Sequence, residues 1–319
     1  MSKTSTDPRR QSLAGPTMGT RWTALFHTAA TFDAGPLHRA LQAAVDEVDS
    51  QMSTWRPDSD LMRLNAAPVG TWVALPARLM QVLALGLAIG RASGGAFDIG
   101  LGDAVRAWGF GPDPAQPDSI RAASQAARRP AYEGLDLDPG AGRARKRAAL
   151  ALDLNGIAKG YGTDRLAEVM AAAGVGAALV GIDGEMRASG LRPDGQPWTL
   201  AIEAPDPGRR APQSILALHD AAVATSGDYR HRVTVQGRPL SHTMDPARGA
   251  PLQAAPASVT VVAPTCAEAD AWATALMVLG PDRGAALVRD HGLHALFLLR
   301  ETDGLRARGL GALFTPPSS

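Results

Sequence analysis

The chain has 319 residues, 45% of them hydrophobic and 20% charged, which is the composition of a globular protein with material for a core. Its 32 basic and 31 acidic residues leave a formal net charge of +1, so no overall field would recruit nucleic acid or an anionic membrane. The single cysteine, Cys266, excludes an internal disulfide and a cysteine-based metal cluster. The longest apolar stretch, "VLALGLAIG" from Val82, is too short for a transmembrane segment.

Both ends of the chain are predicted to be disordered tails, residues 1–14 and 315–319, around a single domain of residues 15–314. The first tail holds two adjacent arginines, Arg9 and Arg10, but no apolar segment follows them, as a secretory signal would require. The sequence as it stands therefore predicts a cytoplasmic protein. A periplasmic or membrane-associated protein is the alternative if an export signal is missing from the sequence.

The first half of the chain predicts a strand and two helices. The strand is "TRWTALFHT", residues 20–28, and the second helix runs from Pro76 to Ala92, because proline suits a first helical turn and "SGG" follows as a stop. Residues 110–149, rich in Pro, Gly and Arg, predict an insertion or linker with one short amphipathic helix. The first helix is predicted from apolar residues at spacings of three and four, which are Leu37, Leu41, Val45, Val48 and Met52.

The second half predicts a run of short strands without helices between them, rich in Val, Ile, Leu and Thr. Two helices at 268–280 and 281–290 and a strand at 294–300 complete it. Strands in such runs are typical of an α+β fold with an antiparallel sheet and packed helices, and argue against a doubly wound sheet. The predicted strands of the run are 149–154, 177–183, 186–190, 198–204, 214–220, 221–227, 231–237 and 258–264.

One predicted helix carries candidate metal ligands, since Asp270 and Thr274 are four residues apart and project from the same helix face. A carboxylate and a hydroxyl suit Mg²⁺, which prefers hard oxygen ligands. The pair also has a structural interpretation. Asp near a helix start often caps the helix, and Thr on a helix often bonds to its own backbone.

The stretch "LDLNGIAKGYGTDRL", residues 152–166, predicts an anion site at the start of a helix. Gly156 and Gly160 let backbone groups approach a ligand, the helix N-terminus offers N–H groups, and Lys159 adds a charge suited to a pyrophosphate. The alternative is a plain strand-to-helix turn with a solvated lysine. Other polar residues at predicted strand ends, of types that also dominate turns, are Asp98, Ser226, Asp228, His242 and Asp245.

Several blocks occur in a specific order: "PTMGTRW", "MSTWRPDSDLMRLN", "GGAFDIGLGDAVRAWGFG", "LDLNGIAKGYGTD", "VATSGDYR", "SHTMDPARGAP" and "SVTVVAPTCAEADAWATALMVLG". Together they cover nearly the whole chain, and the chain resembles the FAD:protein FMN transferases, the ApbE-like flavin transferases. The resemblance implies a T-fold-like α+β domain. It also implies an enzyme that moves the FMN half of FAD onto a threonine hydroxyl of an acceptor flavoprotein subunit, with Mg²⁺ present and AMP released.

The resemblance implies roles for individual residues. FAD contacts would come from Met18, Trp55, Ala96, Phe97, Asp98, Asp153, Lys159, Ser226 and Thr243. Mg²⁺ ligands would be Gly156, through its carbonyl oxygen, and Asp270, Ala273 and Thr274.

Two positions depart from the family's pattern. Asp183 stands where the family usually shows a second glycine, and "DPARG" replaces the commoner Asp-Pro-x-Thr-Gly. If position 183 needs a positive φ, aspartate is among the residues that tolerate it best, so we expect a local adjustment there.

His242 is the predicted general base, because histidine titrates near neutrality and can take the acceptor's proton. Asp270 and Asp245 are the alternative bases. Two other functions stay open at this point. One is a Mg²⁺-dependent FAD pyrophosphatase, in which water replaces threonine and gives FMN and AMP. The other is a non-catalytic FAD-binding protein, which would not need the pair Asp270 and Thr274.

Overall fold

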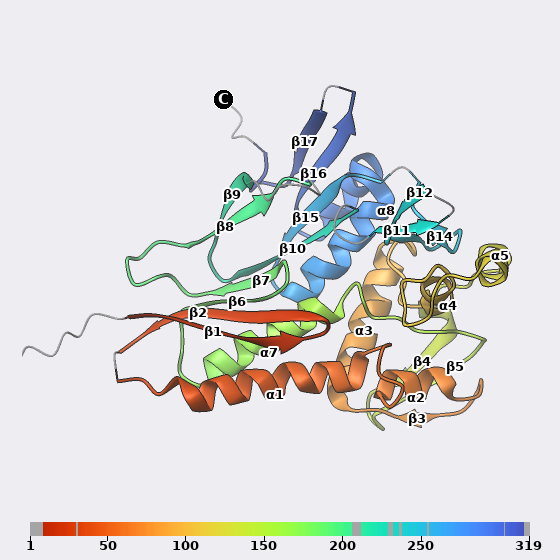
Figure 1. Cartoon of the computed structure of the whole chain (residues 1–319), viewed down its shortest axis with the longest axis horizontal. Helices are drawn as coiled ribbons and strands as arrows, with labels where there is room; N and C mark the ends of the chain where they lie inside the picture. The colour runs from red at the N-terminus through yellow and green to blue at the C-terminus, as the bar shows by residue number, and fades with distance from the viewer. Residues whose placement is uncertain are drawn as a thin grey trace, which may run out of the picture.

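The computed structural model describes residues 9–29, 31–205, 212–228, 232–235, 238–253, 255–302 and 304–315. Within these residues, the largest element is an antiparallel sheet of eight strands in the order β1-β2-β6-β7-β10-β15-β16-β17 (Figure 1). The predicted α+β class with an antiparallel sheet is thereby confirmed. The strands of this sheet are β1 (Arg9–Thr17), β2 (Thr20–Thr28), β6 (Ala178–Ile182), β7 (Glu185–Ser189), β10 (Ala221–Gly227), β15 (Ser258–Ala263), β16 (His294–Glu301) and β17 (Gly304–Leu310).

Smaller sheets and the helices surround the large sheet. The other strands are β3 (Val73–Ala74), β4 (Leu135–Asp138), β5 (Arg143–Lys146), β8 (Trp198–Glu203), β9 (Pro212–Leu218), β11 (Arg232–Val235), β12 (Arg238–Ser241), β13 (Met244–Asp245) and β14 (Ala250–Pro251). The helices are α1 (Ala34–Met52), α2 (Asp60–Ala66), α3 (Ala77–Ala92), α4 (Gly102–Ala107), α5 (Pro117–Gln125), α6 (Ala131–Gly134), α7 (Ala158–Ala172) and α8 (Cys266–Asp290).

The first two strands form a hairpin around the turn Met18–Gly19, whose φ angles are 45° and 71°. Positive φ at both positions is what a two-residue hairpin turn of this kind requires. The predicted disordered tail is wrong for residues 9–14, which lie in β1. β1 is an edge strand that pairs with β2 in the large sheet. Its sequence has no alternating apolar pattern from which the strand could be predicted. In the second predicted tail, 315–319, Thr315 donates from its N–H and its Oγ1 to the carbonyl oxygen of Gly311. Residues 1–8 and 316–319 lie outside the described residues.

Helices cover one face of the large sheet, and the β8–β9 hairpin covers part of the other (Figure 1). α1 and α7 pack against β2 and β6, while α8 packs against β10 and β15. β15 shows the two-sided burial directly, because Val261 joins the core under the helices and Val262 joins the core under the hairpin. Trp198 of β8 and Leu216 of β9 are buried in this second core.

The long helices follow the sequence pattern. Every apolar residue that predicts α1 is buried, and α3 begins directly after Pro76. The two helices predicted at 268–280 and 281–290 are confirmed as the two arms of α8, which break at Gly280 with a φ of 70°. Asp164 of α7 accepts the N–H groups of Cys266 and Ala267, each at 2.9 Å, and so holds the first turn of α8. None of the described helices is long and apolar enough to span a bilayer.

Residues 149–154 do not form the predicted strand. The side chain of Asn65 instead donates to the carbonyl oxygen of Leu152 at 2.9 Å and accepts from its N–H at 2.7 Å. The side chain of Asn65 thus pairs both peptide groups of Leu152, while the N–H of Asp153 donates to Ile99 and the carbonyl oxygen of Ala151 accepts from Gly102. The predicted short helix of the 110–149 region is present as α5, and β4 and β5 of this region pair with β3 in a three-stranded sheet.

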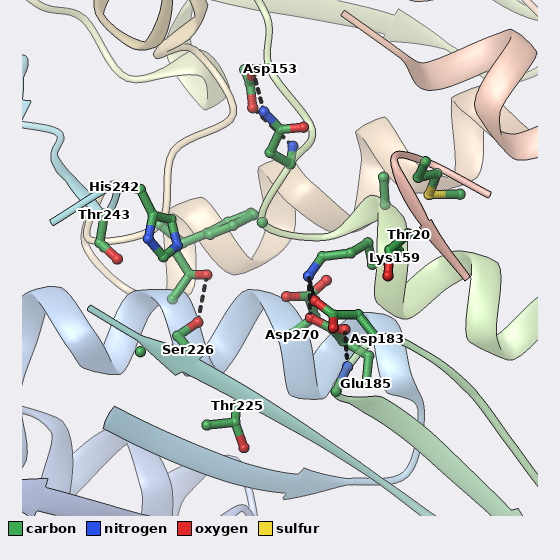
Figure 2. Close-up of a pocket in the computed structure, with 18 of the residues that line it drawn as sticks. Thr20, Asp153, Lys159, Asp183, Glu185, Thr225, Ser226, His242, Thr243 and Asp270 are labelled. Atoms are coloured by element: carbon green, nitrogen blue, oxygen red, sulfur yellow. Dashed lines mark hydrogen bonds and ion pairs between the residues drawn. The ribbon is translucent and has the colours of Figure 1, made fainter. Parts of the chain in front are cut away.

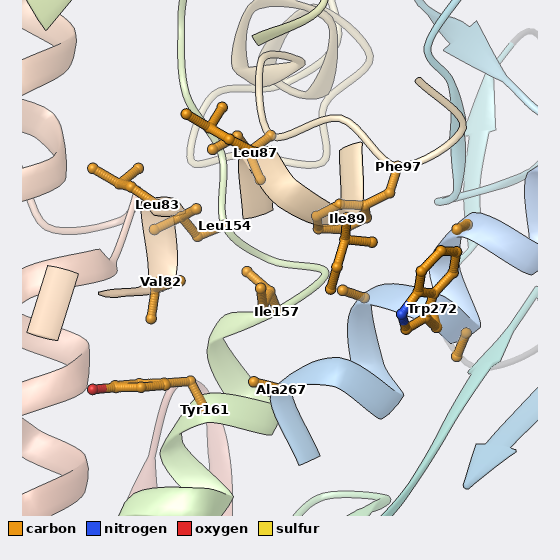
Figure 3. Close-up of a cluster of buried hydrophobic side chains, with 14 of the residues drawn as sticks. Val82, Leu83, Leu87, Ile89, Phe97, Leu154, Ile157, Tyr161, Ala267 and Trp272 are labelled. Carbon is orange, nitrogen blue, oxygen red and sulfur yellow. The ribbon is translucent and has the colours of Figure 1, made fainter. Parts of the chain in front are cut away.

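The loop before α7 is anchored by apolar packing (Figure 3). Leu154 and Ile157 are fully buried in the largest core, together with Phe97, Ile89 of α3 and Trp272 of α8. The polar residues between and after them therefore sit on a backbone that the core fixes in place.

Candidate functional site

A cavity of about 1570 Å³ lies where the loop before α7, the β6–β7 turn, the end of β10 and α8 meet. His242 and all the predicted FAD contacts and metal ligands line it except Ala273, while Asp245, an alternative base, does not. The volume exceeds the roughly 300–1000 Å³ of a typical small-molecule pocket. The cavity therefore has room for a large ligand and part of a second reactant.

α7 and α8 meet at Gly160 and Asp270. The N–H of Gly160 donates to Oδ2 of Asp270 at 3.1 Å, and the Asp270 side chain is buried. A Cβ on residue 160 would clash with the carbonyl oxygen of Cys266 and lie 2.8 Å from Cβ of Asp270. Gly160 thus brings the two helices together, which is a structural reason for one of the glycines in the predicted anion-binding stretch.

We expect Gly160→Ala to lower the free energy of unfolding by about 2 kcal/mol or more, because the backbone of α8 would have to move. Gly176→Ala is the matched control, since an added Cβ there would meet nothing within 4 Å. Denaturant unfolding of both variants measures the difference. Equal stability of the two variants would contradict the close approach of α7 to α8.

Lys159 is held by acidic side chains at the turn between β6 and β7 (Figure 2). Its Nζ lies 2.7 Å from Oε1 of Glu185 and 3.7 Å from Oδ2 of Asp183. The buried Glu185 also accepts the N–H of Gly184, at 3.1 Å. Asp183 has a φ of 55°, so this position does adopt the left-handed conformation that aspartate was expected to tolerate.

The charges of Lys159, Asp183, Glu185 and Asp270 shift the pKa values of Lys159 and Asp270. Burial, together with the negative charge of Glu185, raises the pKa of Asp270 to about 7. Burial opposes the charge on Lys159, but the carboxylates of Glu185, Asp270 and Asp183 together raise the pKa of Lys159. The lysine is therefore protonated at neutral pH, while Asp270 is divided between its two forms. A cation beside Asp270 would favour its ionised form.

Thr274 lies one helical turn after Asp270, and its Oγ1 is 3.2 Å from Oγ of Ser226. A Cβ on Gly156 would lie 3.2 Å from Oγ1 of Thr274, so the backbone at Gly156 passes directly beside this hydroxyl. Ala273 is fully buried in the core and does not line the cavity. Its methyl group has no ligand atom, which leaves only its backbone for the predicted role.

The predicted donor set fits Mg²⁺. Asp270, Thr274 and the peptide of Gly156 bring together hard oxygen atoms from α8 and from the loop before α7. Within the residues that the structure describes, no three His, Cys, Asp or Glu side chains could hold a metal ion together. Hydroxyl and carbonyl donors are therefore needed. Burial and Glu185 raise the pKa of Asp270, and a cation bound beside this carboxylate would oppose that shift.

His242 and Thr243 enter the cavity on one side of the view in Figure 2, and Lys159 and Asp270 enter on the other. His242 is half-buried, so its ring can meet a molecule in the cavity. Asp245, an alternative base, does not line the cavity, and its Oδ1 accepts the N–H of Ala247 at 3.0 Å within its own turn. Geometry therefore favours His242 over Asp245 as the base.

Two predicted FAD contacts also organise the loops that carry them. Oδ1 of Asp98 accepts the N–H groups of Gly100 and Ala131 at 2.8 and 3.0 Å, and burial raises its pKa. Asp153 accepts the N–H of Asn155 at 2.9 Å. Burial raises the pKa of Asp153 to about 6, although this hydrogen bond opposes the shift. Both carboxylates line the cavity, and their contact with FAD stays a prediction.

The apolar part of the cavity wall includes an exposed aromatic ring. The Trp55 side chain is 59% exposed although it lines the cavity, so its ring face is available for stacking. Met18 lines the same cavity from the β1–β2 turn, in a left-handed conformation that is rare for methionine. Strained residues of this kind often occur at ligand sites.

The sequence did not indicate Glu185 as part of the site. Its carboxylate meets Lys159 only because the β6–β7 hairpin returns to the start of α7, and no local motif relates positions 26 apart in this way. The signal in the sequence was the short run "DGE" at the end of a predicted strand. Such a run is also an ordinary turn, so it carries little information by itself.

The chain is similar to known flavin transferases over most of its length. It is 36% identical over 300 residues to the FAD:protein FMN transferase of Klebsiella pneumoniae (strain 342), with 92% of this chain and 85% of the relative covered. The solved apo structure of the Pseudomonas stutzeri flavinyl transferase ApbE has a TM-score of 0.84 and 37% identity, over 96% of this chain and 97% of that one. The flavin transferase ApbE from Vibrio cholerae has a TM-score of 0.85 and 32% identity, over 97% and 99%.

The part of the chain that matches the family model includes the residues that line the cavity. The model of the ApbE family matches residues 18–297, a range that begins at Met18 in the β1–β2 turn and includes Lys159, His242 and Asp270. The predicted resemblance is thus confirmed by family, by sequence relatives and by solved structures. The chain belongs to the ApbE family.

Proposed function

We propose that the protein is a FAD:protein FMN transferase, which moves FMN from FAD to a threonine hydroxyl of an acceptor flavoprotein, with Mg²⁺ present and AMP released. The observation that carries the proposal is that one cavity contains three kinds of group. Asp270 and Thr274 offer oxygen ligands for a metal ion, His242 is a candidate base, and Lys159 supplies a positively charged side chain. The names of the relatives support the same activity.

In the proposed reaction, the threonine oxygen forms a bond to the phosphorus of the FMN half of FAD. The bond from that phosphorus to the bridging oxygen breaks, and AMP leaves with the electron pair. A ring nitrogen of His242 takes the proton of the threonine hydroxyl. The ammonium of Lys159 offsets negative charge that develops on the pyrophosphate. When bound by Asp270, Thr274 and the Gly156 carbonyl, Mg²⁺ would neutralise charge on the same oxygens.

The flavin would lie against apolar wall residues, with Trp55 and Phe97 supplying ring faces. Trp55 lines the cavity and is exposed to solvent, so the acceptor protein would approach the site beside this ring. Residence in the cytoplasm is also part of the proposal, and fractionation of the natural host would test it.

The test is to incubate the purified chain with FAD, Mg²⁺ and an acceptor protein, and to measure the acceptor's mass. We expect an increase of one FMN less one water, and no increase with an acceptor in which threonine is replaced by valine. Release of FMN and AMP without labelled acceptor would instead indicate a pyrophosphatase. FAD that binds and remains intact would indicate a non-catalytic binding protein.

A further inference from the structure

The turn between β6 and β7 places two carboxylates on one lysine of the cavity. Asp183 and Glu185 flank Gly184, and both reach Nζ of Lys159, at 3.7 and 2.7 Å (Figure 2). Glu185 is held in this place by its burial and by the N–H of Gly184. Lys159 is therefore already engaged by protein carboxylates, where its place in the sequence predicts a contact with pyrophosphate.

Asp270 adds a third carboxylate to this group, since its charge acts on Lys159 together with those of Glu185 and Asp183. Asp183 and Glu185 already set two carboxylates against the single ammonium of Lys159, so the carboxylates outnumber the ammonium without Asp270. All four side chains line the cavity. The pyrophosphate of FAD is itself an anion, so it meets repulsion from this group as well as attraction to Lys159.

We propose that Asp183 and Glu185 make FAD binding depend on the divalent cation, by keeping this end of the cavity negative until a cation is bound. The inference rests on the proposed function, since it takes FAD and Mg²⁺ as the ligands. Binding of either ligand then strengthens binding of the other by the same factor. The two residues act on the pyrophosphate through charge and through Lys159, so they are positioning residues and not catalytic ones.

Asp183 is the better residue for a test. Its side chain is 30% exposed and lies in a turn, so a substitution there disturbs the packing less than one at the buried Glu185. Asparagine has nearly the same shape, tolerates the left-handed conformation at a φ of 55°, and lacks the charge. The chain also offers a matched control. Asp220 has a φ of 47° and lies outside the cavity lining, so Asp220→Asn makes the same chemical change in the same backbone conformation.

The experiment measures the Kd of FAD by flavin fluorescence anisotropy at about pH 8, once with Mg²⁺ and once with EDTA. We expect wild type to bind FAD more tightly with Mg²⁺. In EDTA, Asp183→Asn should bind FAD about tenfold more tightly than wild type, the order expected for removing one nearby charge. With Mg²⁺ the two proteins should differ less. Glu185→Gln, which keeps an oxygen acceptor for Lys159, should shift the EDTA value in the same direction.

The outcomes separate the inference from the proposed function. The inference is overturned if Mg²⁺ leaves the Kd of wild type unchanged, or if Asp183→Asn behaves like Asp220→Asn in EDTA. Either result would leave FMN transfer itself intact. A wild-type protein that binds no FAD under either condition would overturn the proposed function as well. Lys159→Met should weaken FAD binding under both conditions, which distinguishes loss of the cation from loss of a carboxylate.

Discussion

Asp270→Asn will abolish Mg²⁺-dependent FMN transfer, with a fall of about 10³-fold or more, while FAD still binds. The change removes the charged member of the donor set, and an amide oxygen is a much weaker ligand for Mg²⁺. The hydrogen bond from the N–H of Gly160 survives, because asparagine keeps an oxygen acceptor. Transfer rates over a Mg²⁺ titration measure the effect. Asp290→Asn, an exposed change on the same helix, is the control.

The same variant should be more stable than wild type in EDTA at about pH 8. Burial and Glu185 raise the pKa of Asp270 to about 7, above its ordinary value of 3.8. The folded state therefore holds a proton that the unfolded state has lost, so wild type loses stability as pH rises from about 4 to 7. Asparagine has no such loss. Equal melting temperatures for both proteins from about pH 4 to 8 would show that ionisation of Asp270 does not destabilise the folded state.

His242→Ala will lower the transfer rate by roughly 10²- to 10⁴-fold, the usual range for loss of a general base, with FAD affinity nearly unchanged. The half-buried ring lines the cavity, where it can accept the proton of an entering hydroxyl. A base acts when it is deprotonated, so the wild-type rate should rise with pH, and His242→Ala should weaken that rise. Rates at saturating FAD, measured across pH, test both statements.

His219→Ala is the control for this change, because His219 is exposed and pairs with Asp220 outside the cavity. If His242 only stabilises its turn, His242→Ala would displace Thr243 and therefore bind FAD more weakly. The pH dependence of its transfer rate would then match that of wild type. A saturated rate equal to that of wild type at about pH 7 would exclude His242 as the base. Asp270 would then be the remaining candidate of those predicted.

The parts of the fold that the sequence predicts are those with periodic burial. α1 shows one apolar face because it packs on a sheet, and the break at Gly280 is visible as Gly-Pro. β1 was missed because pairing with β2 is a contact of backbones, which residue types do not record. Residues 149–154 were misassigned because Leu152 and Leu154 are buried in alternation, as in a strand. The backbone hydrogen bonds of residues 151–153 instead go to the side chain of Asn65 and to a few backbone groups of residues 99–102.

The candidate site divides in the same way. Asp270 and Thr274 could be predicted as a pair because one helix sets their spacing, and the family blocks supplied the other lining residues. The ion pair of Lys159 with Glu185 could not, since it depends on how a hairpin returns to a helix. Sequence separation thus explains the difference. Side chains that one helix brings together can be predicted from the sequence. Contacts between elements that are far apart in the sequence can be identified only from the three-dimensional structure.

The hydrogen bonds from the first turn of α8 to Asp164 would affect which cations the proposed site accepts. Two hydrogen bonds of 2.9 Å join α7 to α8 one turn before Asp270, and the missing Cβ of Gly160 lets the helices touch. A cation between the Gly156 loop and Asp270 would meet walls that resist being pushed apart. Mg²⁺ suits a tight octahedral frame, whereas the larger Ca²⁺ takes more ligands at longer distances in pliable surroundings. We therefore expect the hydrogen-bonded contact between α7 and α8 to favour Mg²⁺ over the larger Ca²⁺ at this proposed site.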